Sequence, residues 1–305
     1  MNYVALYNPL ADNGNAKQNA ENLSVLYPAD DFKFVDASKV NSYNDFFESI
    51  PQSAGVIICG GDGTLNRFIN SALSAPVKQE LFYFPCGSGN DFAREVGTND
   101  KLIPLAKYLK DLPVVTVKGK DYKFINGVGY GIDGYCCEEG DRLRECNPQK
   151  KINYTSIAIK GLLFHYKPAD AVITVDGKRY EFKKVWLAPV MHGKYYGGGM
   201  MPAPNQERNS DSGEVSVMVF HGSNKLKTLC IFPSIFKGEH VKSDKYVCVF
   251  RGKQITVEYK EPRPLQIDGE TIKNVTECTV KSGKTVALSG NDVITEENST
   301  DKTAV

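Results

Sequence analysis

The first third of the chain alternates short apolar runs with segments in which apolar residues recur every three or four positions. The apolar runs predict strands at residues 3–7, 32–35, 56–59 and 81–84. The helical spacing between them predicts helices near residues 16–26, 42–50, 65–74, 91–96 and 101–110. Strands that alternate with helices in this way are typical of an α/β domain with a mainly parallel sheet.

The pattern changes near residue 114 to a series of short strands separated by turn signals. These runs lie at residues 114–117, 122–126, 171–175, 179–185, 215–220, 246–250, 254–259 and 265–267. Such a series predicts a second domain that is a mainly antiparallel β-sandwich. Two segments with helical spacing, residues 150–166 and 225–237, interrupt the strands.

These patterns divide the chain into two domains and a tail. We expect residues 1–120 to form the α/β domain, with residues 281–290 as a segment that could return to it. Residues 121–280 would form the β-rich domain, and the polar residues 291–305 a loose tail. A chain of 305 residues is long enough to bury two cores.

The composition and the distribution of residue types argue against several classes of protein. The 37 basic and 36 acidic residues are balanced, so nothing indicates a nucleic acid partner. The eight cysteines include no Cys-x-x-Cys pair, which argues against a zinc site. The N-terminus lacks the basic region and apolar core of a signal peptide, and no apolar stretch reaches the ~18 residues of a membrane span. We therefore expect a cytoplasmic protein without a transmembrane segment.

Two glycine-rich loops follow neighbouring strands of the expected parallel sheet. Gly60-Gly61-Asp62-Gly63-Thr64 follows residues 56–59, and Gly87-Ser88-Gly89-Asn90-Asp91 follows residues 81–84. Ligands of such sheets bind beyond the carboxyl ends of the strands, and glycine lets them approach the backbone. The free N–H groups at the start of a helix attract anions such as phosphate. The pair of loops therefore predicts a cradle for a polyphosphate, and the acid in the first loop indicates a metal ion or a role on the transferring group.

The two loops resemble the paired signatures of the diacylglycerol kinase catalytic domain family. That family includes bacterial diacylglycerol kinases and related lipid kinases, sphingosine kinases and ceramide kinases, and it shares its fold with NAD kinases and phosphofructokinases. The resemblance extends over most of the chain, in the family's order, through Asn8-Pro9, Gly60–Asn66, Pro85–Arg94, Asn126–Asp133, Gly193–Met200, Pro202-Ala203-Pro204 and Asp268-Gly269-Glu270.

The resemblance implies a kinase that binds ATP and Mg²⁺ in a cleft between its two domains. It implies that Asp62 acts near the phosphates, through magnesium or the substrate hydroxyl, and that Glu270 is the general base. Phosphoryl transfer needs a proton acceptor, and whether Asp62 or Glu270 takes the proton stays open. The residues that would contact the nucleotide by similarity are Asn8, Gly60, Gly61, Asp62, Gly63, Thr64, Ser88, Gly89 and Asn90.

The chain departs from the family pattern at a few positions. Arg67 stands where the bacterial members usually carry a glutamate, and it would either contact phosphate or point into solvent. Asp211-Ser212-Gly213 is similar to an Asp-Asp-Gly segment that is a magnesium site in some bacterial members, which makes Asp211 a candidate metal ligand. The segment lacks one of its two carboxylates, although a hard cation needs several oxygen ligands. Ser216 replaces an aspartate that often follows.

The main hypothesis is an ATP-dependent lipid kinase that phosphorylates a hydroxyl of a diacylglycerol-like or sphingoid-like lipid at the cytoplasmic face of a membrane. A kinase of a soluble alcohol, as in the NAD kinases, is a second hypothesis. A non-catalytic nucleotide- or lipid-binding protein is a third, supported by Arg67, Ser212 and Ser216.

Two further features concern partners. Residues 150–166 combine lysines with apolar residues, so this helix would either lie on an anionic membrane or cover the β domain. An exposed sheet edge in the second half could pair with another copy, which leaves a homodimer open.

Overall fold

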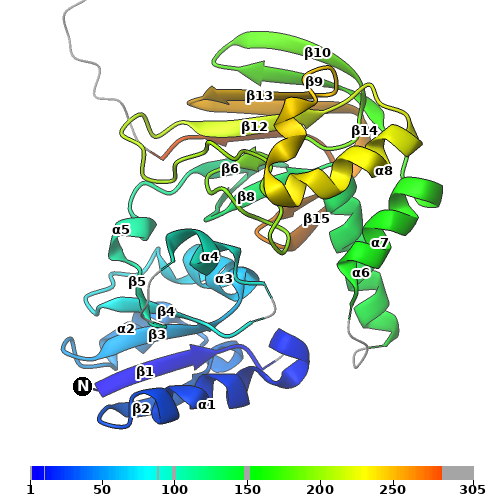
Figure 1. The fold of residues 1–305 in the computed structure, drawn as a ribbon. Coiled ribbons are helices and arrows are strands. Elements are labelled where there is room, and N and C mark those ends of the chain that lie inside the picture. Colours follow the sequence, from blue (N-terminus) through cyan, green and yellow to red (C-terminus); the bar gives the residue numbers. More distant parts are fainter. Residues whose placement is uncertain (1, 10, 88, 98–100, 148–151, 284–305) are drawn as a thin grey trace, which may run out of the picture.

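Two sheets, each with its own helices, make up the molecule (Figure 1). The computed structural model describes residues 2–9, 11–87, 89–97, 101–147 and 152–283. The α/β class of the first part and the antiparallel β class of the second, both expected from the sequence, are confirmed.

The first sheet has the strand order β2-β1-β3-β4-β5. The strands are β1 (Asn2–Tyr7), β2 (Asp31–Asp36), β3 (Gly55–Gly60), β4 (Leu81–Pro85) and β5 (Ile103–Pro104). The first four pair in parallel, and β5 runs antiparallel to β4. Every residue of β3 is buried, as is usual for a central strand with helices on both faces.

Helices cover the two faces of this sheet. They are α1 (Ala16–Leu26), α2 (Tyr43–Glu48), α3 (Asp62–Ala72), α4 (Asp91–Val96) and α5 (Ala106–Leu109), with 3₁₀ turns η1 (Ala11–Gly14) and η2 (Ala37–Lys39). Successive residues of a strand point to opposite faces. Ile57 of β3 accordingly packs with Leu23 of α1, and its neighbour Ile58 packs with Leu65 of α3.

The second sheet is antiparallel throughout, with the order β13-β12-β11-β8-β14-β15-β6-β7, and β9 pairs with both β14 and β10. Its strands are β6 (Val114–Val117), β7 (Lys120–Lys123), β8 (Gly127–Tyr130), β9 (Ala169–Val175), β10 (Lys178–Val185), β11 (Val190–Met191), β12 (Val215–Phe220), β13 (Val247–Gly252), β14 (Gln254–Ile267) and β15 (Glu270–Lys281). The register between β14 and β15 shifts between Glu258 and Leu265. On its other side, β14 pairs with β9 before this shift and with β8 after it. The sheet thereby curves around one apolar core that includes Val128, Val217 and Ile255.

A group of helices stands together on one side of the second sheet (Figure 1). They are α6 (Ile132–Cys146), α7 (Tyr154–Lys160), the π-helical turn η3 (Gly161–His165), α8 (Lys225–Ile231) and the 3₁₀ turns η4 (Phe232–Lys237) and η5 (Glu239–Lys242). Ile132, Ile157 and Ile231 pack with Trp186 in a separate buried cluster beneath them.

The helix α6 was not predicted from the sequence pattern, and it is the main difference between the expected and the observed elements. Gly134 and Gly140 lower its intrinsic helix propensity. Both glycines are required by packing, because a Cβ on Gly134 would collide with the carbonyl of Pro264 and one on Gly140 would lie 2.8 Å from the ring of Tyr154. Tertiary contacts thus override local propensity here.

Smaller departures concern boundaries. The helix expected at residues 65–74 begins at Asp62, which places that carboxylate in its first turn. The helix expected at residues 101–110 is instead β5 followed by the short α5, and the strands expected at 254–259 and 265–267 are one strand, β14.

Residues 114–123 form β6 and β7 in the second sheet, and β15 ends in the same sheet at Lys281. The expected return of residues 281–290 and the tail at 291–305 fall almost wholly outside the described residues. None of the helices in the described ranges is both long and apolar enough to cross a membrane.

Replacement of Ile57 by alanine tests the core of the first domain. Ile57 is 0 % exposed, so the loss of its side chain should cost ~2–5 kcal/mol of stability through lost burial and a residual cavity. Val25→Ala on α1 is the control, because Val25 is 78 % exposed and should change stability by no more than ~0.5 kcal/mol. Urea denaturation followed by circular dichroism compares the two variants, and equal midpoints would contradict the assignment of Ile57 to the core.

Candidate functional site

The two glycine loops pack against each other, backbone to backbone, at the carboxyl ends of β3 and β4. The N–H of Asp62 donates to the carbonyl of Gly89 at 3.0 Å, and the N–H of Cys86 donates to that of Gly60 at 3.1 Å. A Cβ on Gly61 would lie 2.6 Å from the carbonyl oxygen of Gly89, and one on Gly87 would collide with the N–H of Gly61. Only glycine allows this approach.

Asp62 links the first loop to the helix that follows the second. Its carboxylate accepts the backbone N–H groups of Asp91 at 2.7 Å and Phe92 at 3.1 Å, the first two residues of α4. Those groups have no partner within the helix, so Asp62 satisfies donors that would otherwise be buried and unpaired. Burial, and then the nearby charge of Asp91, raise the pKa of Asp62 to about 7.

Two carboxylates of α4 reach the second domain. Asp91 accepts the N–H of Gly198 at 2.7 Å, and burial raises its pKa. Glu95 accepts the N–H of Lys194 at 2.9 Å and pairs with the buried Arg208 at 2.7 Å. The segment 193–199, singled out in the sequence for its glycines, is therefore held against the helix that follows the second loop.

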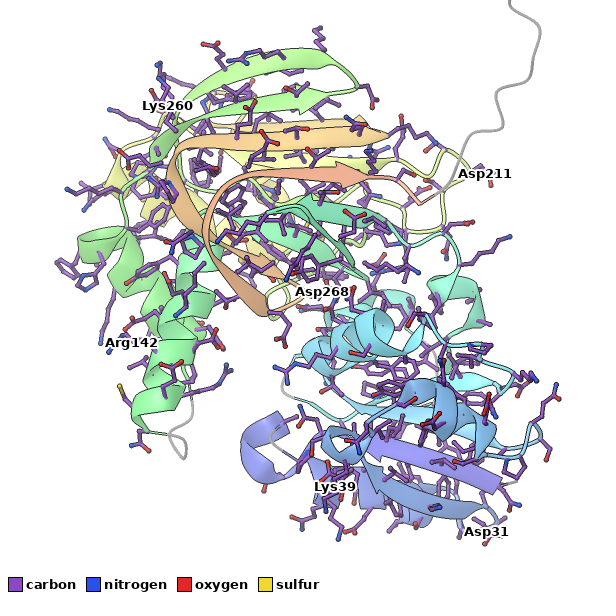
Figure 2. The ribbon with its side chains drawn as sticks, turned by 180° about the vertical axis from the view of Figure 1, so that it is seen from behind. Asp31, Lys39, Arg142, Asp211, Lys260 and Asp268 are labelled. Carbon is purple, nitrogen blue, oxygen red and sulfur yellow. The ribbon has the colours of Figure 1, made fainter. Side chains whose placement is uncertain are left out.

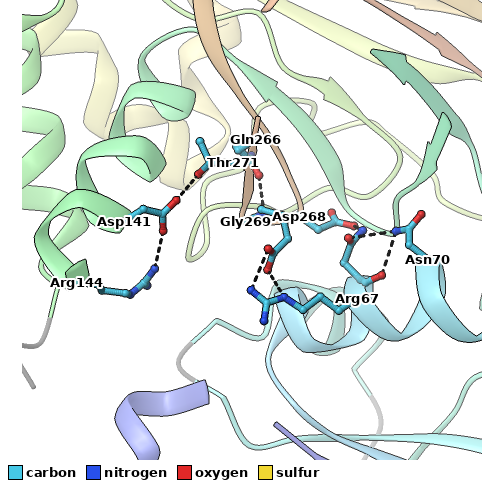
Figure 3. Close-up of polar contacts among 10 residues, drawn as sticks. Arg67, Asn70, Asp141, Arg144, Gln266, Asp268, Gly269 and Thr271 are labelled. Atoms are coloured by element: carbon cyan, nitrogen blue, oxygen red, sulfur yellow. Dashed lines mark hydrogen bonds and ion pairs between the residues drawn. The ribbon is translucent and has the colours of Figure 1, made fainter. Parts of the chain in front are cut away.

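Asp268 joins the two domains from the other side (Figure 3). Its carboxylate accepts three backbone N–H groups, from Ile125 at 2.6 Å and from Asn126 and Gly127 at 2.9 Å. The side chain of Asn66 on α3 donates a fourth bond at 2.9 Å. Burial raises the pKa of Asp268, and these donors oppose that shift by stabilising the ionised form.

Glu270 is the first residue of β15. It contacts Arg67 of α3, the residue that follows Asn66. Arg67 donates through Nε to one carboxylate oxygen at 2.9 Å and through Nη2 to the other at 3.0 Å (Figure 3). A Cβ on Gly63 would lie 3.4 Å from Oε1 of Glu270, so this carboxylate sits over the first turn of α3. Arg67, which departs from the family pattern, thus binds Glu270, the expected general base.

The remaining residues of the predicted nucleotide set lie around the same loops. Asn8 follows β1, next to β3 in the sheet, and Thr64 packs against Gly60. Asn90 donates to the carbonyl of Gly87 at 2.8 Å and accepts from the hydroxyl of Tyr83 at 3.3 Å. Ser88 lies outside the described residues.

Asp211 is not part of this assembly. It is exposed, in a loop that precedes β12, and Figure 2 shows it well away from Asp268. In the part of the chain that the structure describes, no group of three or more His, Cys, Asp and Glu side chains is arranged to hold a metal ion. The role of Asp211 as a metal ligand stays a prediction.

Sequence reasoning singled out the loops but missed several residues that hold them in place. Asp268 and Asp91 belong to motifs that were recognised, and their own roles were not assigned. Glu95 lies four residues after Asp91, and this spacing places both carboxylates on the same face of α4. The spacing could therefore have indicated that Glu95 acts beside Asp91. Arg208 is isolated in the sequence, and only the fold brings it to Glu95.

Two models of known protein families match the chain. Residues 2–117 match the model of the diacylglycerol kinase catalytic domain, and residues 126–287 match that of the YegS C-terminal NAD kinase beta sandwich-like domain. The chain belongs to the diacylglycerol kinase family that combines these two domains. The resemblance seen in the sequence motifs is thereby confirmed.

Members of this family from several bacteria are similar to the chain. A protein named "Putative lipid kinase YtlR" from Bacillus subtilis is 27% identical over 237 residues, which cover 70% of this chain and 73% of that protein. "Diacylglycerol kinase" from the same species is 27% identical over 231 residues, 70% of each chain. The "Crystal structure of a putative diacylglycerol kinase from Bacillus anthracis str. Sterne" superposes with a TM-score of 0.64 at 21% identity and covers 92% of both chains, which supports the fold.

Replacement of Asp62 by asparagine should alter how stability depends on pH. The pKa of Asp62 is raised from 3.8 to about 7 in the native state, so the native protein holds this proton more tightly than the unfolded chain does. The resulting stabilisation is complete below about pH 4 and is lost as the pH rises through about 7. Wild type should therefore gain stability relative to Asp62→Asn, by at most ~4 kcal/mol, between about pH 8 and about pH 4.

Thermal denaturation of both proteins across this range measures the difference. Asp31→Asn is the matched control, because Asp31 is exposed at the start of β2 and at the opposite edge of the sheet. A difference between wild type and Asp62→Asn that stays constant with pH would show that Asp62 titrates normally in the native protein.

Adjacent residues of α3 offer a second comparison. Asn66→Ala removes a buried donor from Asp268 and should cost ~1–3 kcal/mol. Arg67→Ala breaks an ion pair whose side chains are 57% and 39% exposed, and it should cost at most ~1 kcal/mol. Denaturation midpoints at one pH rank the two, and the reverse ranking would mean that Arg67 rather than Asn66 secures the domain junction.

Proposed function

We propose that this protein is an ATP-dependent lipid kinase that transfers the γ-phosphoryl group of ATP to a hydroxyl of a diacylglycerol-like lipid. The observation that carries the proposal is the meeting of three elements at one place: the paired glycine loops, the N-terminus of α3, and Glu270 from the second domain above it. The names of the relatives support a lipid acceptor.

Backbone groups of the loops would bind the phosphates. The N–H of Asp62 is already bonded to Gly89, so the N–H groups of Gly63 and Thr64 in the first turn of α3 are the ones that would face the phosphates at the positive end of the helix dipole. The glycines leave room for phosphate oxygens at the backbone. Asp62 cannot contribute to this anion site as a bare charge, because both its oxygens accept N–H groups of α4. Its contribution is to fix the second loop relative to the first.

Magnesium is proposed only as the companion of ATP, whose phosphate charge it neutralises. A separate site at Asp211 does not fit the described residues, because this carboxylate is exposed and its neighbour Ser212 offers a hydroxyl where a hard cation needs several oxygen ligands. No step of the reaction is assigned to Asp211.

Glu270 is the better placed of the two acids to accept the proton of the lipid hydroxyl. Its side chain is 39% exposed and faces the first turn of α3, whereas Asp62 is buried and already bonded to α4. For this role Arg67 must release one oxygen of Glu270. Arrival of a phosphate group, which attracts a guanidinium through the same bidentate geometry, provides the reason for release.

The Arg67–Glu270 ion pair also favours a second candidate function, that of a nucleotide-binding protein without catalytic turnover. In the structure both carboxylate oxygens of Glu270 accept from Arg67, so neither is open to the proton of an alcohol in this arrangement. A nucleotide-binding homologue without turnover would have this arrangement.

An activity assay over a panel of lipid and soluble alcohols distinguishes the candidates. With ATP and magnesium, diacylglycerol should be phosphorylated, with sphingoid bases and NAD as alternative acceptors in the same panel. Glu270→Gln should lower the rate by ~10²–10⁴, as expected for loss of a general base. Asp62→Asn should abolish activity by misplacing the second loop, while the matched Asp31→Asn should retain it. Nucleotide binding without turnover of any alcohol would reject the proposal in favour of the second candidate.

A further inference from the structure

Two large apolar side chains stand exposed on neighbouring elements of the second domain. Phe164 of η3 is 72% exposed and Leu226 of α8 is 73% exposed. The ammonium group of Lys225 donates to the carbonyl of Leu163 at 2.7 Å, which brings the neighbours of Phe164 and Leu226 into contact although about 60 residues separate them in the chain. Figure 1 shows η3, which follows α7, beside α8 on one side of the domain.

The elements that present these side chains are firmly held from beneath. Ile157, Leu162 and Ile231 are buried in the cluster around Trp186. Asn153 caps α7 and Asn224 caps α8 through side-chain oxygens that accept backbone N–H groups. The exposed apolar residues therefore belong to the outer face of fixed helices rather than to a frayed end.

Lysines surround these side chains. Lys160, Lys167, Lys225 and Lys227 are exposed, and residues 152–169 and 221–238 contain no Asp or Glu. Nearby carboxylates are already paired, since Asp170 binds Lys183 at 2.8 Å and Glu139 binds Arg142 at 2.7 Å. We call this patch the α7–α8 surface. It comprises Ile159, Lys160, Phe164, Lys167, Lys225, Leu226 and Lys227.

We propose that the α7–α8 surface docks the protein on a lipid bilayer with anionic head groups, an inference that rests on the proposed function and names where the kinase meets its lipid. Protruding apolar side chains ringed by lysines suit such an interface, because the former enter the acyl boundary and the latter attract anionic lipids. A stable protein interface engages about 20–30 residues on each side, whereas the α7–α8 surface comprises seven.

The α7–α8 surface is connected to the candidate site through α6. This helix packs against α7, and its Asp141 accepts the hydroxyl of Thr271 at 2.7 Å, next to Glu270 (Figure 3). Docking at this surface would therefore bring the membrane to the side of the domain from which Glu270 is held.

Flotation of the full-length protein with phosphatidylglycerol/phosphatidylcholine vesicles tests the proposal. Wild type should float with the vesicles, less so as salt is raised, because screening weakens the lysine contribution. The double variant Phe164→Ser/Leu226→Ser should lose at least about tenfold in partition coefficient, as expected for two apolar side chains withdrawn from the interface. Lys160→Glu/Lys167→Glu should lose the salt-dependent part.

Val25→Ser is the matched control, because Val25 is 78% exposed on α1 of the other domain and should leave vesicle binding unchanged. No binding by wild type, or equal binding by the double variant, would overturn the proposal.

A comparison of acceptors separates this inference from the proposed function. The double variant should phosphorylate a short-chain diacylglycerol that is monomeric in water as well as wild type does, and should lose activity only on vesicle-embedded acceptor. If wild type phosphorylates neither acceptor, the kinase proposal fails while flotation still decides the surface. If both acceptors are affected equally by the double variant, the α7–α8 surface is not a docking site.

Discussion

The buried carboxylate of Asp268 is the contact on which the arrangement of the two domains depends. A carboxylate taken out of water is stable only where several donors replace its hydration, and here the backbone of 125–127 and the side chain of Asn66 supply them. Those donors come from the start of the second domain and from α3 of the first. Because Glu270 lies two residues beyond Asp268, the same contact also fixes the position of Glu270, the proposed proton acceptor.

Asp62 and Asp91 repeat this principle at the glycine loops. Each is a buried acid whose oxygens accept backbone N–H groups, and each joins elements that are separate in the sequence. Acids next to the proposed phosphate site would repel a phosphate group if they were bare. Their hydrogen bonds with N–H groups spread that charge, which lessens this repulsion.

Arg67 alters the balance of this site relative to the family pattern. In place of a usual acid, the chain has a cation that reaches across to Glu270, so one residue of α3 holds the second domain by an exposed ion pair while its neighbour Asn66 holds it by a buried hydrogen bond. The first type of contact is weak and can exchange partners, whereas the second is costly to break. A site that admitted a nucleotide and a lipid between the two domains, as proposed above, would benefit from both kinds of contact.

The sequence by itself determined the two fold classes, the place of the glycine loops at the strand ends, and the family. These follow from local signals: alternation of apolar runs, glycine where the backbone must come close, and motifs in a fixed order. It did not predict α6, because Gly134 and Gly140 argue against a helix until the neighbouring strand and Tyr154 are in place.

Only the tertiary structure decided what the acids do. The sequence predicted Asp62 near the phosphates and assigned no role to Asp91 or Asp268. The fold shows each of the three bonded to backbone groups far away in the chain. The pairing of Arg67 with Glu270 and of Glu95 with Arg208 joins residues more than a hundred positions apart. No local pattern encodes such contacts, because they depend on how the two domains pack and on which buried donors remain to be satisfied.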